Sequence, residues 1–281
     1  MRLKKFISNF SNKLLLNPNI NVLLIWFTVI FISLVPLAID VPESYFSNKY
    51  NIFNQLFVKK AWMWNLISIG PYMILTSYVY GVDHWKSSLI RSILRLLCGT
   101  VIWYFWAQVI FPAVDHWTGV CKLKTGVPDF TCTTKSNCKT LNGFWSSLDI
   151  SGHCFLLSFI ILFVSSELQI HKHWNKIPSK ASLVFPLGSK SLTTVKKRFI
   201  ATKQVIYVFY VFNCLLLALW YTMMLVTCLY FHDYIDKPLG AGIAITSWMA
   251  IYKEWYKSKI SPGMPGKGHL FNLLSTVSKK Q

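Results

Sequence analysis

The segment VIYVFYVFNCLLLALWYTMMLVTCL (Val205–Leu229) contains no charged side chain. About 20 consecutive, mostly apolar residues are enough for a helix to cross the hydrocarbon core of a membrane. Because this segment is longer than that, it predicts a transmembrane helix. Similar apolar blocks occupy Val22–Ala38, Ala61–Tyr80, Leu89–Phe111, Ile150–Leu168 and Leu239–Tyr256. Together the blocks predict an all-α integral membrane protein with six transmembrane helices.

The composition supports the same fold class. Hydrophobic residues make up 53% of the 281 residues and charged residues only 14%, whereas a soluble domain usually carries about 25% charged residues. The formal net charge of +19 has two interpretations, nucleic-acid binding or the positive-inside bias of a membrane protein. The basic residues lie between apolar blocks, so we favour the second interpretation and expect no nucleic-acid partner.

The distribution of Lys and Arg predicts the orientation. Most of the basic residues lie in the N-terminal segment, the connection after the second block, the connection after the fourth block and the C-terminal tail. Lysine- and arginine-rich loops face the cytosol, so both termini are expected there. The predicted organisation is a cytosolic segment 1–21, a membrane domain 22–256 with a lumenal loop 112–149 and a basic cytosolic loop 169–204, and a cytosolic tail 257–281.

Two prolines mark expected irregularities in these helices. Gly70-Pro71 lies inside the second block and is expected to kink or split it, which membrane helices tolerate. Pro112 follows the third block and is expected to end it.

The lumenal loop contains Cys121, Cys132 and Cys138. An oxidising compartment allows a disulfide there. Three cysteines leave one unpaired, and the sequence does not indicate which one.

Two histidines are predicted at one membrane face. His153 opens the fourth block, and His232 follows the fifth. Paired imidazoles suit phosphoryl transfer, in which one attacks phosphorus and the other protonates the leaving oxygen. Asp236, four residues after His232, could orient the nucleophile. In a purely structural interpretation the histidines are interface residues and Ser151 and Asp236 cap helices.

A metal site is a weaker interpretation of the same region. His116, His153 and His232 share the predicted lumenal side with several aspartates, but they lack the tight Cys/His spacing of a zinc site. The sequence also has no P-loop and no dinucleotide-binding fingerprint. We therefore expect neither a metal nor a cofactor.

The decapeptide Leu148-Asp149-Ile150-Ser151-Gly152-His153-Cys154-Phe155-Leu156-Leu157 resembles the signature of the fat storage-inducing transmembrane (FIT) family. That family is similar to the lipid phosphate phosphatases. The resemblance implies His153 as the general acid, His232 as the nucleophile and Asp236 as the orienting carboxylate, with Ser151, Gly152 and Lys237 binding substrate.

The resemblance also implies an activity and a location. The expected reaction is cleavage of the diphosphate of fatty acyl-CoA at the lumenal side of the endoplasmic reticulum membrane. Its products would be an acyl 4′-phosphopantetheine and adenosine 3′,5′-bisphosphate, and its roles would be lipid droplet formation and lipid homeostasis. The expected partners are fatty acyl-CoA and the neutral lipids and phospholipids of the membrane; the sequence names no protein partner.

The chain departs from the lipid phosphatases at several positions, among them Ile150, which stands where those enzymes carry a proline. Leu225 and Val226 stand where those enzymes carry Ser-Arg before the nucleophile, so the usual cation for phosphate is missing. The lysines that could replace it are Lys237, Lys122, Lys124, Lys135 and Lys139. The alternative function is a non-enzymatic membrane protein that binds diacylglycerol or triacylglycerol and partitions neutral lipid into droplets.

Overall fold

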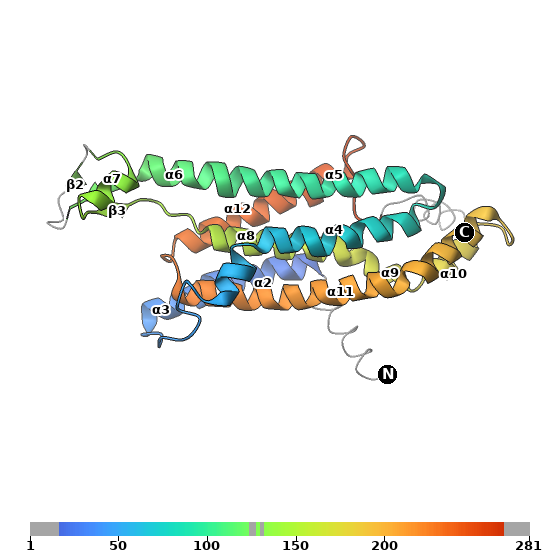
Figure 1. Cartoon of the computed structure of the whole chain (residues 1–281), viewed down its shortest axis with the longest axis horizontal. Coiled ribbons are helices and arrows are strands. Elements are labelled where there is room, and N and C mark those ends of the chain that lie inside the picture. The colour runs from blue at the N-terminus through green and yellow to red at the C-terminus, as the bar shows by residue number, and fades with distance from the viewer. Residues whose placement is uncertain (1–16, 124–127, 130–131, 267–281) are drawn as a thin grey trace.

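Long helices run side by side along the longest axis of the molecule in the computed structural model (Figure 1). The structure describes residues 17–123, 128–129 and 132–266. In these ranges the α-helices are α2 (Pro18–Phe31), α3 (Val35–Ala38), α4 (Ala61–Tyr80), α5 (Trp85–Tyr104), α6 (Phe111–Thr118), α7 (Lys135–Thr140), α8 (Gly152–Glu167), α9 (His171–Trp174), α10 (Ile177–Val184), α11 (Lys190–Tyr230) and α12 (Asp236–Trp248).

Short turns of tighter or wider helix connect several of these elements. The 3₁₀ turns are η2 (Ile32–Leu34), η4 (Val82–His84), η6 (Leu168–Ile170) and η8 (Trp255–Lys257). The π-helical turns are η3 (Phe53–Val58), η5 (Phe105–Ile110) and η7 (Met249–Glu254).

Helix α8 forms the centre of the bundle. It packs against α2, α4, α11 and α12. The span Gly152–Trp174, which begins with α8, has 89% of its most apolar stretch buried. A helix that is hydrophobic on every side belongs in such a central position. Helices α2, α4, α11 and α12 therefore surround α8, and the faces that do not contact α8 lie toward the outside of the bundle.

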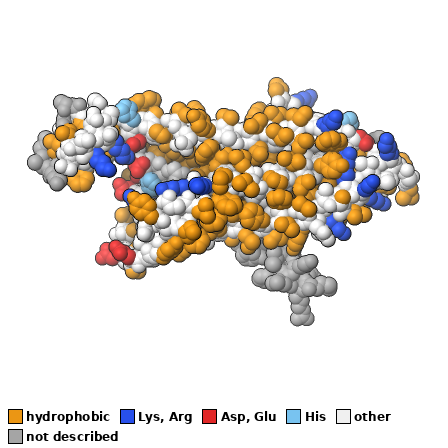
Figure 2. All heavy atoms as spheres, in the orientation of Figure 1, with side chains coloured by type: hydrophobic (Ala, Val, Ile, Leu, Met, Phe, Trp, Pro, Cys, Tyr) orange, Lys and Arg blue, Asp and Glu red, His pale blue; other side chains and the backbone are white. Residues whose placement is uncertain are grey.

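Within the described residues, four helical runs are long and apolar enough to cross a membrane. They are Pro18–Ala38, Val82–Thr118, Gly152–Trp174 and Lys190–Tyr230. Figure 2 shows hydrophobic side chains covering the middle of the visible face, while most of the charged side chains lie toward its two ends. The chain is thus a mostly helical membrane protein. The remaining predicted spans coincide with α4 and with α12 followed by η7.

The expected split at Pro71 and the expected stop at Pro112 are both wrong. Helix α4 continues through Pro71 without splitting. Helix α5 continues through η5 into α6, so Pro112 does not end it. The π-helical turn η5 changes the hydrogen-bond register just before Pro112, which places that proline in the first turn of α6, where a missing N–H costs little.

The predicted basic loop 169–204 is largely helical. It contains α9 and α10 and the first turns of α11. Helix α11 has 41 residues, which corresponds to roughly 60 Å at 1.5 Å per residue. Because the hydrocarbon core is only about 30 Å thick, α11 must project well beyond it.

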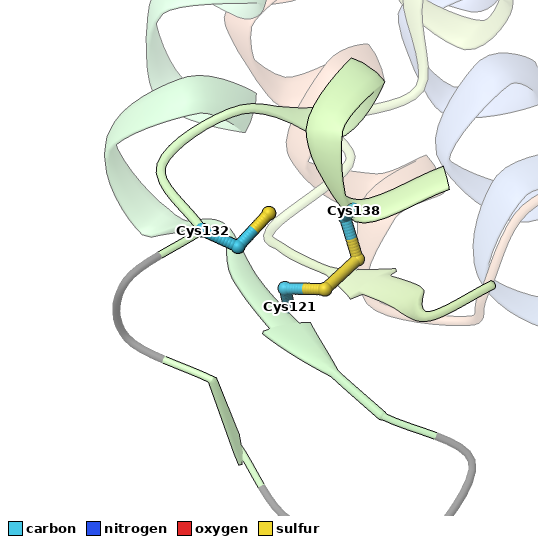
Figure 3. A group of neighbouring side chains, drawn as sticks. All are labelled: Cys121, Cys132 and Cys138. Carbon is cyan, nitrogen blue, oxygen red and sulfur yellow. A yellow bond between two sulfur atoms is a disulfide. The ribbon is translucent and has the colours of Figure 1, made fainter. Parts of the chain in front are cut away.

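The predicted lumenal loop 112–149 forms a small structure of its own at the left end of Figure 1. Strand β1 (Val120–Lys122) pairs antiparallel with both β2 (Pro128–Asp129) and β3 (Phe144–Ser146). A disulfide joins Cys121 to Cys138, which decides the pairing that the sequence left open. Cys132 is a buried free thiol whose sulfur points toward that disulfide (Figure 3).

A buried ion pair lies at the end of α8 opposite His153. Arg95 of α5 donates from Nε to Oε1 of Glu167 at 2.8 Å and from Nη2 to Oε2 at 3.0 Å. The Tyr252 hydroxyl donates to the same carboxylate at 2.7 Å, and Ser92 accepts from Arg95 at 3.1 Å. Buried charges are stable only when they are paired and hydrogen-bonded, as they are here. This cluster therefore joins α5, α8 and η7.

Candidate active site

The N-terminus of α8 is held by Ser151 and by the first turn of α12. The Ser151 hydroxyl caps the helix by accepting from the Cys154 N–H at 3.3 Å. The Ser151 N–H donates to the backbone carbonyl of Asp236 at 3.1 Å. These two bonds fix the position of Gly152 and His153 in the first turn of α8.

Helix α12 approaches α8 closely because Gly240 has no side chain. A Cβ on Gly240 would lie 2.4 Å from the Ser151 carbonyl oxygen and 3.2 Å from the Phe155 nitrogen. Both neighbours are backbone atoms, so neither can move without shifting α8. Gly240 thus determines how near the N-terminal turns of α12 lie to His153.

The variant Gly240→Ala is expected to destabilise the protein by about 1–3 kcal/mol and to lower its activity, because the added methyl pushes the start of α8 away. Thermal unfolding in detergent measures the first effect. Gly152→Ala is the matched control, since nothing lies within 4 Å of a Cβ at that position. Equal melting temperatures for the two variants would contradict the role of Gly240.

His232 lies in the turn between α11 and α12. Its φ of +58° is in the left-handed region, which costs energy for a residue with a side chain and is frequent at functional sites. Its ring centroid is 6.2 Å from that of His153, with an interplanar angle of 71°. The structure therefore brings together the two histidines that the sequence predicted at one face.

A carboxylate lies beside His232. The Asp149 Oδ2 is 3.5 Å from the His232 Nδ1, which is ion-pair distance. The hydrogen bond with His232 lowers the pKa of the Asp149 carboxyl, while partial burial opposes that shift. Asp149 is therefore ionised near neutral pH. The sequence predicted Asp236 for this position, but the structure places Asp149 there.

Both imidazoles face one open pocket. Its other polar wall residues come from the segment before α4 and from the π-helical turn η5. The lining residues are Lys59, Trp103, Ala107, Gln108, Gly152, His153, Leu156 and His232. Figure 2 shows histidine, lysine and carboxylate side chains gathered at this end of the molecule. The pocket thus combines two imidazoles, one ammonium and one carboxamide.

The predicted residues Lys237, Asp236 and Lys135 do not line this pocket. Lys237 is buried, and its Nζ donates to the Cys228 backbone carbonyl at 2.8 Å. Asp236 contributes its carbonyl to Ser151. Lys135 contacts Asp115 at 3.3 Å in the small structure formed by residues 112–149, and Lys124 lies outside the described residues.

Sequence reasoning gave no role to Lys59, Gln108 or Asp149. Asp149 stands inside the decapeptide and four residues before His153, so its place in the motif was the available signal. Lys59 and Gln108 are far from both histidines in sequence. Only the packing of η3 against α11 and of η5 against α8 brings them near the site.

Comparison with known proteins identifies the family of this chain. Residues 42–252 match the family described as fat storage-inducing transmembrane protein. The chain belongs to the fat storage-inducing transmembrane family. This match confirms the family that the decapeptide indicated, and it covers most of the chain.

Curated FIT-family relatives carry the name acyl-coenzyme A diphosphatase FITM2. The Xenopus laevis protein is 31% identical over 231 residues, which are 80% of this chain and 77% of the relative. The Mus musculus protein is 32% identical over 251 residues, and the Homo sapiens protein 31% over 241 residues; each match covers 85% of this chain and 83% of the relative. No solved structure matches the chain.

Proposed function

We propose that this FIT-family protein hydrolyses the diphosphate of fatty acyl-CoA. The observation that carries the proposal is the pair of imidazoles at one pocket, with Asp149 beside His232. The printed activity of the relatives, acyl-coenzyme A diphosphatase, names a reaction for which this arrangement is suited. The products are an acyl 4′-phosphopantetheine and adenosine 3′,5′-bisphosphate.

The geometry supports a two-step phosphohistidine mechanism. Asp149 accepts a hydrogen bond from the proton on Nδ1 of His232. This tautomer leaves the Nε2 lone pair free to attack phosphorus. As the bridging P–O bond breaks, His153 donates a proton to the leaving oxygen. His153 then takes a proton from water, whose oxygen attacks the phosphohistidine and releases His232. The enzyme is thereby returned to its starting state, and one water molecule has been added across the broken P–O bond.

We propose six transmembrane helices with both termini in the cytosol. The four apolar runs, together with α4 and with α12 and η7, make six spans. The basic residues of α9, α10 and the first turns of α11 lie at the end of the bundle away from His153. By the positive-inside rule that end faces the cytosol. The pocket then opens to the lumen of the endoplasmic reticulum. The reaction there supports lipid droplet formation and lipid homeostasis.

The direct test is incubation of detergent-purified protein with oleoyl-CoA. We expect release of adenosine 3′,5′-bisphosphate and oleoyl phosphopantetheine in equal amounts, detected by chromatography and mass spectrometry. Absence of both products from folded protein would contradict the proposal. Saturable binding of diacylglycerol by such an inactive protein would instead support the non-enzymatic alternative.

The variant Asp149→Asn is expected to lower kcat by about 100-fold, because a neutral amide cannot stabilise the His232 imidazolium or hold its tautomer. The matched variant is Asp236→Asn, which tests the carboxylate that the sequence predicted. The structure favours the larger loss in Asp149→Asn. A larger loss in Asp236→Asn would return the orienting role to Asp236.

A further inference from the structure

Lys59 is the cation of the pocket that contains the two histidines. None of the other residues that line this pocket carries an ammonium or guanidinium group. Among the ion pairs of the described residues, none includes Lys59. Its Nζ donates to a neutral oxygen, Oε1 of Gln55, at 3.2 Å. The charge of Lys59 is therefore not neutralised by a carboxylate.

The segment that carries Lys59 is tied to the bundle by two tryptophans. The indole of Trp64 donates to the Leu56 carbonyl at 3.0 Å, and that of Trp220 donates to the Phe57 carbonyl at 3.3 Å. The Lys59 N–H donates to the Asn54 carbonyl at 3.0 Å. These bonds fix the backbone of Lys59 against α4 and α11, while its side chain stays exposed.

The other lysines near this end of the bundle are less suitable. Lys237 is buried and bonded to the Cys228 carbonyl, and Lys135 is paired with Asp115. Lys60, the next residue after Lys59, is exposed but does not line the pocket. A diphosphate carries negative charge on both phosphorus atoms, and its transfer depends on cations placed around those oxygens.

We infer that Lys59 forms an anion subsite that binds a phosphate oxygen of the diphosphate between His153 and His232. The subsite deepens the proposed function and rests on it for the identity of the substrate. It supplies the positive charge that lipid phosphatases take from an arginine close to the nucleophile. Here that charge comes from a different element, the segment between η3 and α4.

The test separates binding from turnover. In a His232→Ala background, which cannot turn over, Lys59→Ala is expected to raise the Kd for oleoyl-CoA about 10-fold, the size of one lost charge-assisted hydrogen bond. Lys59→Arg should restore most of the affinity. Lys60→Ala is the matched control and should leave the Kd unchanged. Oleic acid, which has no diphosphate, should bind all of these variants equally.

Salt and a phospholipid identify the ligand. The effect of Lys59→Ala should shrink as ionic strength rises, because the contact is electrostatic. Dioleoyl phosphatidic acid should depend on Lys59 less than oleoyl-CoA does; an equal dependence would reassign the subsite to lipid headgroups and overturn the inference. An unchanged Kd for oleoyl-CoA in Lys59→Ala would overturn it as well.

The outcome is distinguishable from failure of the proposed function. If the wild type does not hydrolyse oleoyl-CoA but Lys59→Ala still weakens its binding, the subsite stands and the hydrolase assignment falls. If the wild type is active, the single variant Lys59→Ala is expected to raise KM about 10-fold while its melting temperature stays equal to that of the wild type. Loss of activity through misfolding would instead lower the melting temperature.

Discussion

Replacing His232 with alanine is expected to lower kcat for oleoyl-CoA hydrolysis by about 1000-fold or more, because the nucleophile of a covalent mechanism has no substitute in the pocket. The structure supports this role through Asp149 at Nδ1 and the open pocket that His232 lines. Initial rates with purified protein measure the loss. An acid-labile adduct of one half of the substrate on the wild-type chain, absent from the variant, would identify the phosphohistidine intermediate.

The matched control is His116→Ala. His116 is exposed in α6 and does not line the pocket, so its loss should leave kcat unchanged. His153→Ala should reduce kcat less than His232→Ala for substrates with a good leaving group, since a general acid matters less there. Substantial activity in His232→Ala would contradict the assignment of the nucleophile.

Replacing Arg95 with methionine is expected to destabilise the protein by about 3–5 kcal/mol, because the buried Glu167 carboxylate loses its partner. The side chains of Arg95 and Glu167 are only 3% and 1% exposed, so water cannot replace the lost contact. Thermal unfolding in detergent should show a melting temperature about 10 °C lower. The pocket of the two histidines lies at the other end of α8, so the folded variant should retain the wild-type KM.

Two further variants define the origin of this effect. Arg91→Met removes an exposed arginine one turn earlier in α5 and should leave the melting temperature unchanged. The double variant Arg95→Met/Glu167→Met removes both charges and should recover most of the stability, since no unpaired charge remains. A double variant as unstable as Arg95→Met would show that the loss arises from packing alone.

The prediction from sequence was most accurate for the existence of helices and least accurate for their ends. The fifth apolar block lies inside α11, yet the helix begins fifteen residues earlier, at Lys190 after its Ser189 cap. The expected stop at Pro112 failed because η5 resets the hydrogen bonding just before it. Hydropathy measures where a helix meets lipid, so it does not report where the same helix continues into water.

The site shows the same division. His153 was found because it follows a recognisable cap, Ser151, and opens an apolar helix, and His232 because it follows another such helix. The orienting carboxylate was assigned to Asp236 from i+4 spacing, which assumes that His232 is helical. The backbone of His232 is left-handed instead of helical, and the carboxylate at ion-pair distance from its ring belongs to Asp149.

The sequence by itself determined the membrane class, the family and the two histidines, because apolar blocks and a contiguous motif are local properties of the chain. The tertiary structure alone decided which carboxylate lies at His232, which lysine enters the pocket, which cysteines pair and which buried charges meet. These depend on contacts between residues far apart in sequence, such as Arg95 with Glu167 and Lys59 with the histidines' pocket. Their energies arise from close packing and burial, which no single segment encodes.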